Sequence, residues 1–210
     1  YTGNGTAGAT IGHGLGKTPS FIIIKDRTSA NGWPVYHKST GNTIFLYLNA
    51  TSGSQVNSTA WNNTSPTSSV FTVGTGTLMN TNGNTYIAYC WAEIEGFSKF
   101  GSYVGNGSTD GTFVYCGFKP AWVMVRAVNS LADWVIMDSS RSSTNPNRKL
   151  LYANLSNIEG DGIDDRNPDL IVDFLSNGFK CRATNNDLNN AETYIFAAFA
   201  ESPFTTANAK

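Results

Sequence analysis

Residues 86–93 read Tyr-Ile-Ala-Tyr-Cys-Trp-Ala-Glu, and this segment decides the fold class. Aromatic and β-branched residues favour strands, and successive side chains of a strand point to opposite faces. The alternation places tyrosine, alanine and cysteine side chains on one face and isoleucine, tyrosine and tryptophan side chains on the other. Both faces are apolar, as in strands that are covered on both sides. The segment is therefore predicted to be a central strand.

The same segment returns later in the chain, within a longer series of matches. Thr193-Tyr-Ile leads to Ala200-Glu201 in the way that Thr85-Tyr-Ile leads to Ala92-Glu93. The other matches keep their order, and they pair Tyr1–Thr6 with Tyr103–Ser108, Pro19–Lys25 with Pro120–Arg126, Trp33–Tyr36 with Trp134–Met137, and Leu46–Asn49 with Leu151–Asn154. Matches in a fixed order indicate an internal duplication. We predict one repeat over residues 1–100 and a second over residues 101–210.

Each predicted repeat has the size of a small β-sandwich, about one hundred residues. Apolar runs at 21–25 and 122–126 follow a proline, as buried strands often do, and runs at 33–37 and 134–138 would complete hairpins. Residues 96–101 join the halves with two phenylalanines and no flexible linker. The predicted fold is all-β, with two tandem β-sandwich-like repeats packed as one pseudo-symmetric unit.

The composition supports this fold class and excludes several functions. The 210 residues include 21 Gly, 12 Phe, 9 Tyr and 5 Trp, which suit short strands and turns better than helices. Fourteen Lys and Arg against fifteen Asp and Glu give no basic field for nucleic acid. No apolar run approaches the roughly 20 residues of a membrane helix. The three cysteines lack metal-binding spacing and are expected to be buried.

Several longer segments resemble a duplicated β-rich domain of bacteriophage structural and tail-fibre-like proteins, often from marine phages and from prophages. The segments are Trp61–Gly74, Tyr86–Glu93, Gly96–Gly107, Gly117–Val125, Phe174–Lys180 and Ala197–Phe204. The resemblance covers nearly the whole chain. Such domains are often appended to lectin-like or fibre segments, which implies an extracellular place on the virion surface and a role in host attachment. The resemblance brings no catalytic motif to this chain.

These observations predict a non-enzymatic virion surface module that needs no cofactor. The expected partners are a bacterial surface glycan or another envelope ligand, and other fibre domains of the same chain. A homo-oligomer stays open as a further partner. The chain begins at Tyr1 without Met, so we expect it to be part of a longer polypeptide. Two alternatives remain, a purely structural spacer or decoration domain and an enzyme that degrades polysaccharide.

Motifs that would indicate an enzyme lack the context they require. Gly3–Gly8 fits the pattern GxGxxG, but a dinucleotide site needs a strand before the motif and a helix after it. His13 and His37 have no spacing that suggests a catalytic triad or a metal site. Glu93 and Glu201 end matching strands, and a shared structural role explains the pair more simply than a hydrolase does. The sequence therefore predicts no catalytic residue.

The best candidate for ligand binding is the polar loop of residues 51–69. Trp61 lies in this loop without a tryptophan counterpart in the second half, and Asn62, Asn63 and Thr64 follow it. An exposed ring stacks well on a sugar, and neighbouring amide and hydroxyl groups can bind the sugar's edge. The alternative is a buried Trp61 that holds its own loop against the core.

A second candidate is an acidic loop near residue 160. Asp161, Asp164, Asp165 and Asp169 could offer oxygen ligands to calcium. Their spacing is not that of an EF-hand, so a solvated loop is the simpler interpretation.

Overall fold

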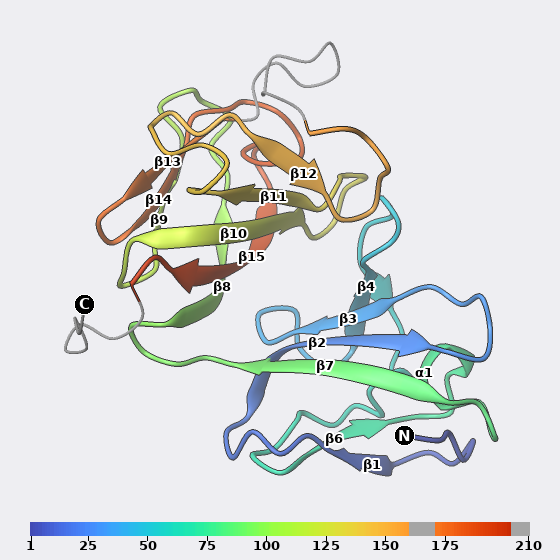
Figure 1. The fold of residues 1–210 in the computed structure, drawn as a ribbon. Coiled ribbons are helices and arrows are strands. Elements are labelled where there is room, and N and C mark those ends of the chain that lie inside the picture. The colour runs from blue at the N-terminus through green and yellow to red at the C-terminus, as the bar shows by residue number, and fades with distance from the viewer. Residues whose placement is uncertain (160–170, 203–210) are drawn as a thin grey trace. The chain divides into compact units, whose positions relative to one another are not determined.

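A computed structural model describes residues 1–159 and 171–202, and within these ranges the chain is almost entirely β (Figure 1). Strands account for nearly all of the regular structure, with one four-residue helix, α1 (Thr77–Asn80). The predicted all-β class is confirmed. The chain divides into two compact units, Tyr1–Ala92 and Glu93–Lys210, and each is described here by itself. The predicted boundary after residue 100 would cut through strand β8 (Ser98–Val104), which belongs wholly to unit 2.

Unit 1 contains a five-stranded antiparallel sheet and a two-stranded one. The larger sheet has the order β5-β4-β3-β2-β7, formed by β2 (Pro19–Asp26), β3 (Pro34–His37), β4 (Ile44–Tyr47), β5 (Gln55–Val56) and β7 (Tyr86–Ala92). The smaller sheet pairs β1 (Ala9–Gly12) with β6 (Val70–Val73). Apolar side chains of both sheets and of α1 form one core, which includes Ile22, Phe45, Trp61, Phe71 and Met79.

Unit 2 contains a five-stranded antiparallel sheet and a three-stranded one. The order in the larger sheet is β12-β11-β10-β15-β8, formed by β10 (Pro120–Ala127), β11 (Val135–Asp138), β12 (Leu150–Tyr152), β15 (Thr193–Ala200) and β8. The smaller sheet has the order β13-β14-β9, formed by β9 (Phe113–Tyr115), β13 (Val172–Leu175) and β14 (Gly178–Cys181). The buried core residues of unit 2 include Val125, Trp134, Phe179, Cys181 and Phe196.

The two units use similar pairings and similar ring contacts. In β2 and β7 the register begins with Pro19 opposite Ala92 and then shifts, and in β10 and β15 it begins with Pro120 opposite Ala200 and then shifts. A tyrosine stacks on the first tyrosine of the last strand in each unit. The ring centroids of Tyr1 and Tyr86 lie 5.0 Å apart, and those of Tyr103 and Tyr194 also lie 5.0 Å apart.

The prediction of a central strand is correct for one unit and wrong for the other. In unit 2, β15 lies between β10 and β8, as predicted. In unit 1, β7 is the edge strand of its sheet, and Tyr89 is 43% exposed. The reason is the pairing on the far side. Strand β8 covers that side of β15, whereas the pairing beside β7 within the described residues is limited to the first two residues of the chain.

Asp26 anchors the loop that follows β2. Its carboxylate accepts hydrogen bonds from the backbone amides of Thr28 and Ser29 and from the side-chain amides of Asn31 and Asn84, at 2.8–3.0 Å. Burial alone would raise the pKa of Asp26. The hydrogen bonds outweigh this effect and lower the pKa below its ordinary value, because each favours the charged form.

Replacing Asp26 with asparagine is expected to weaken the fold at neutral pH and to flatten its acid dependence. A lowered pKa means that the carboxylate stabilises the folded state above its unfolded pKa, near 3.9, and that this stability is lost as the pH falls through the folded value. We expect Asp26→Asn to lose about 2–3 kcal/mol at pH 7, and less at pH 3. Urea unfolding at both pH values measures this, with the exposed Glu95→Gln as a control. If the unfolding free energies of the wild type and of Asp26→Asn fell by the same amount between pH 7 and pH 3, the role of Asp26 would be contradicted.

Candidate ligand-binding face

The outer side of the small sheet in unit 2 carries two exposed aromatic rings. Phe113 and Tyr115 are 43% and 63% exposed, while Val114 between them is buried in the core. In the sheet, Phe113 lies opposite Lys180 and Tyr115 opposite Gly178. Since directly opposed residues of an antiparallel pair point to the same side, the two rings and Lys180 share one surface. We call this surface the aromatic face, and it also includes Asp110, Asp173 and Arg182.

A glycine keeps the centre of the aromatic face flat. A Cβ atom at Gly178 would lie 2.0 Å from the carbonyl oxygen of Val114 and 3.2 Å from the ring of Phe113. Only a residue without a side chain fits at this contact. Gly178 therefore places no side chain opposite Tyr115 or beside the Phe113 ring.

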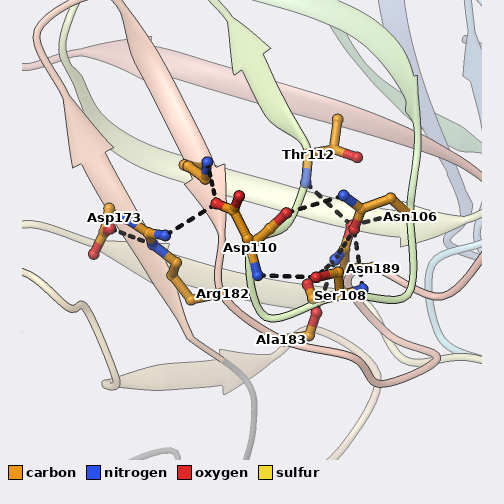
Figure 2. A network of polar contacts seen from close by, with 9 residues as sticks. Asn106, Ser108, Asp110, Thr112, Asp173, Arg182, Ala183 and Asn189 are labelled. Carbon is orange, nitrogen blue, oxygen red and sulfur yellow. Dashed lines mark hydrogen bonds and ion pairs between the residues drawn. The ribbon is translucent and has the colours of Figure 1, made fainter.

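The charged groups of the aromatic face alternate in sign, and Figure 2 shows Asp173, Arg182 and Asp110 among them. The Arg182 Nε lies 2.6 Å from an Asp173 oxygen, and the Arg182 guanidinium also lies 3.6 Å from Asp110. The ammonium group of Lys180 lies 2.6 Å from Asp110. The hydrogen bond and the charge of Lys180, with a smaller contribution from Arg182, lower the pKa of Asp110. The cationic groups are thus held in place beside Phe113 and can still donate to a ligand.

A buried amide fixes the loop that carries Asp110. The Asn189 side chain donates hydrogen bonds to the Asn106 side-chain oxygen at 2.9 Å and to the carbonyls of Ser108 and Ala183 at 2.8 Å each (Figure 2). Its own oxygen accepts from the Asn106 backbone amide at 3.2 Å. Asn189 is fully buried, and its bond to Ala183 lies in the interior, whereas its bonds to Asn106 and Ser108 lie at the half-buried edge of the core. The edge of the aromatic face is therefore rigid before any ligand arrives.

Unit 1 has no aromatic rings at the corresponding place. Ile11 lies opposite Phe71 in the small sheet of unit 1, as Val114 lies opposite Phe179 in unit 2. The exposed neighbours of Ile11 are Thr10 and Gly12, where unit 2 has Phe113 and Tyr115. A similar sheet thus forms without exposed rings, so the fold itself does not require them. Exposed aromatic residues that the fold does not need are typical of binding surfaces.

The structure places Trp61 in the core of unit 1, with 1% of the residue exposed. Its indole N–H donates to the carbonyl of Ile44 at 3.1 Å, and its ring meets Tyr36 edge to face at 5.5 Å. Neither face of the ring is open to a sugar. The hypothesis of an exposed stacking ring at Trp61 is therefore corrected: a large aromatic side chain gains more from burial than from solvent, and its polar atom finds a backbone partner.

The three residues after Trp61 form a turn at the surface. Asn62 and Asn63 have φ angles of 52° and 49°, the left-handed region that asparagine tolerates better than most residues. The Thr64 hydroxyl donates to the Asn62 carbonyl at 2.8 Å. Their polar groups shape the turn, and the Trp61 ring that was expected to form a sugar site with them is buried.

The other candidate residues have structural partners or lie outside the described residues. Glu93 pairs with Lys99 and Glu201 with Lys119, each at 2.8 Å. Asp161, Asp164, Asp165 and Asp169 fall outside the described residues. Among the residues that the structure does describe, no group of three His, Cys, Asp or Glu side chains could hold a metal ion. In the same residues, no helix is long and apolar enough to cross a membrane.

The sequence did not predict Phe113 and Tyr115, because the difference that marks them appears only when the small sheets of the two units are aligned. The pattern Phe-Val-Tyr at 113–115 aligns with Thr-Ile-Gly at 10–12 once the sheets are paired. Only the middle residue is apolar in both. The two aromatic residues at outward positions of one unit are the difference that marks this surface.

Fold and surface together define an all-β protein of two units with a rigid aromatic face on one of them. The chain belongs to a family described as a domain of unknown function, DUF7483, whose model matches residues 1–203. No curated protein and no solved structure matches the chain.

Proposed function

We propose that the chain is a non-enzymatic surface module of a bacteriophage structural or tail-fibre-like protein, and that it attaches to bacterial surface glycans through the aromatic face. The observation that carries the proposal is the pair of exposed rings, Phe113 and Tyr115, where unit 1 has Thr10 and Gly12. The phage assignment rests on the sequence resemblance described above. A place on the virion exterior follows from that assignment.

The chemistry of the aromatic face suits a sugar polymer. The C–H groups of a pyranose pack well on the face of a phenyl or phenol ring, and polar groups beside the ring bind the hydroxyls. Lys180 and Arg182 donate hydrogen bonds, while Asp110 and Asp173 accept them and balance the two positive charges. The face therefore offers donors and acceptors to sugar hydroxyls, and hydroxyl-rich polysaccharides are the ligand class that fits it best.

The two rings are expected to account for most of the glycan affinity. The double variant Phe113→Thr/Tyr115→Thr should bind a printed array of bacterial lipopolysaccharides and capsular polysaccharides at least about tenfold more weakly, because each ring is a large contact surface. The control variant Val56→Thr/Leu131→Thr removes two exposed apolar side chains that are not part of this face, one in each unit, and should bind like the wild type. Both variants should keep the wild-type circular dichroism spectrum.

Three results would contradict the proposal. Equal binding by the wild type and the Phe113/Tyr115 variant would remove the aromatic face from the glycan site. A wild-type protein that binds none of the polysaccharides would favour the spacer or decoration domain instead. Release of reducing sugars from an array polysaccharide would favour the third alternative, an enzyme.

A further inference from the structure

The outer edge of β7 presents backbone groups that face a missing neighbour. In an antiparallel ladder, the backbone N–H and C=O groups of successive residues point alternately to the two sides. Arg27 donates to the carbonyl of Thr85, so the odd-numbered residues of β7 bond to β2. The even-numbered residues point away from β2. Of these, Tyr86 exchanges two hydrogen bonds with Tyr1, at 2.8 and 3.0 Å.

Next to Tyr86, this edge is open at Ala88 and Cys90 within the described residues. Ala88 and Cys90 point in the same direction as Tyr86, and within the described residues no strand pairs with them there. A groove of about 410 Å³ runs beside them, lined by Gly12, His13, Phe71 and the β7 residues. The groove and the open edge thus lie together, directly next to the position of Tyr1.

Unit 2 shows what occupies the corresponding place. Strand β8 pairs with β15 over seven residue pairs, from Val104 opposite Thr193 to Ser98 opposite Phe199. Tyr103 stacks on Tyr194 in this ladder just as Tyr1 stacks on Tyr86. The residues that precede Tyr103 continue along β15, whereas the corresponding length of β7 has no partner among the described residues. The pair of Tyr1 and Tyr86 therefore already fixes the register in which a strand would continue along the open edge of β7.

The side chains along the β7 edge indicate which side chain a strand paired with it would need. At the position of Ala88, unit 2 has Phe196, which fills the space beside Phe179 with its ring. The residue of β8 opposite Phe196 is Gly101, and a Cβ atom there would lie 2.8 Å from the Phe196 ring. Because Ala88 carries no ring, the groove in unit 1 has room for a large side chain at that position.

We propose that the β7 edge and its groove bind one extended strand, antiparallel to β7 and in the register that β8 has on β15. The strand carries a large apolar residue opposite Ala88, which enters the groove toward Phe71. This strand is joined directly to Tyr1, because the pair between Tyr1 and Tyr86 occupies the position of the ladder next to the open edge. A strand from a separate chain would have to end at that point. Pairing with an open sheet edge is a general mode of peptide recognition.

The test adds such a strand and exploits the difference between Ala88 and Phe196. One protein carries Phe-Ser-Lys-Phe-Leu-Ser directly before Tyr1, which is the sequence of residues 97–102 with leucine in place of Gly101. A second carries the unaltered Phe-Ser-Lys-Phe-Gly-Ser, and a third carries Ser-Gly-Ser-Gly-Ser-Gly. Hydrogen exchange at the Ala88 and Cys90 amides reports pairing. The rate of Cys90 alkylation reports a filled groove, since Cys116 and Cys181 are buried in unit 2.

We expect the leucine arm to slow exchange at both amides at least about tenfold and to slow Cys90 alkylation likewise. The Ser-Gly arm should change neither rate. In the variant Ala88→Phe the preference should reverse, so that the glycine arm protects the edge better than the leucine arm. The reversal separates pairing in the β8 register from non-specific contact.

Three results would overturn the proposal. Unchanged exchange in the presence of the leucine arm would show that the edge takes no strand. Protection without reversal in Ala88→Phe would exclude the β8 register. Equal protection by the Ser-Gly arm and the leucine arm would exclude a large apolar side chain opposite Ala88 as the feature that the groove selects.

Discussion

The variant Asn189→Leu is expected to lose about 3–5 kcal/mol of unfolding free energy, the loss being confined to unit 2. Leucine matches the size of asparagine but can neither donate nor accept a hydrogen bond. The carbonyl of Ala183 would lose its partner in the buried interior, and the carbonyl of Ser108 and the backbone amide of Asn106 would lose theirs at its half-buried edge. Each buried polar group left without a partner costs about 1–3 kcal/mol. Hydrogen exchange monitored through urea unfolding measures the loss in each unit separately.

The same experiment has a close counterpart in unit 1. Asn80 is buried and donates to the carbonyls of Thr6 and Gly74 at 2.9 and 2.8 Å, while the Asn4 amide donates to its side-chain oxygen at 2.9 Å. Asn80→Leu should therefore destabilise unit 1 by a similar amount. Asn82→Ala, an exposed neighbour, should change little. If Asn189→Leu and Asn82→Ala were equally stable, the buried amides would not be essential to the fold.

The variant Trp61→Ala is expected to lose about 3–5 kcal/mol of unfolding free energy without losing glycan affinity in the folded protein. The substitution leaves a large cavity beside Tyr36 and removes the hydrogen bond to the Ile44 carbonyl. Trp61→Phe should cost less, about 1–2 kcal/mol, because most of the ring volume is kept. Thermal unfolding measures stability, and the polysaccharide array measures binding at a temperature where both variants are folded.

This pair of measurements distinguishes two roles of Trp61. A stabilising role predicts a lower melting temperature with unchanged array binding. A folded Trp61→Ala protein that had wild-type stability and no glycan binding would contradict the core position of Trp61. It would return the ligand site to the loop of residues 51–69.

The strand content of the protein could be predicted because it follows from local patterns. Apolar runs after Pro19 and Pro120 and the closing segments at 86–92 and 194–200 form strands where they were predicted. The place of a strand in its sheet could not be predicted in the same way. Nearly identical patterns give β15 a neighbour on both sides and β7 an open edge, because that outcome depends on what pairs with the strand.

The prediction of a ligand site at Trp61 was wrong for a related physical reason. A tryptophan within a polar loop looks exposed in sequence, but the loop of Trp61 folds onto the core, and the side chain with the most surface to bury goes inward. Phe113 and Tyr115 look like core residues in sequence, because they flank the buried Val114. Only the register of β9 with β14 shows that they point outward.

The pairing of β2 with β7 has a consequence for the synthesis of the protein on the ribosome. Residues 19–26 and 86–92 come together across most of the length of unit 1, and Tyr1 meets Tyr86 across an even longer interval. Contacts between distant parts of a chain form late and slow folding. The fold of unit 1 is therefore completed only after Ala92 has left the exit tunnel, and the edge of β2 that β7 covers stays unpaired until then. Asn, Ser and Thr in the intervening loops help to keep the nascent chain in solution.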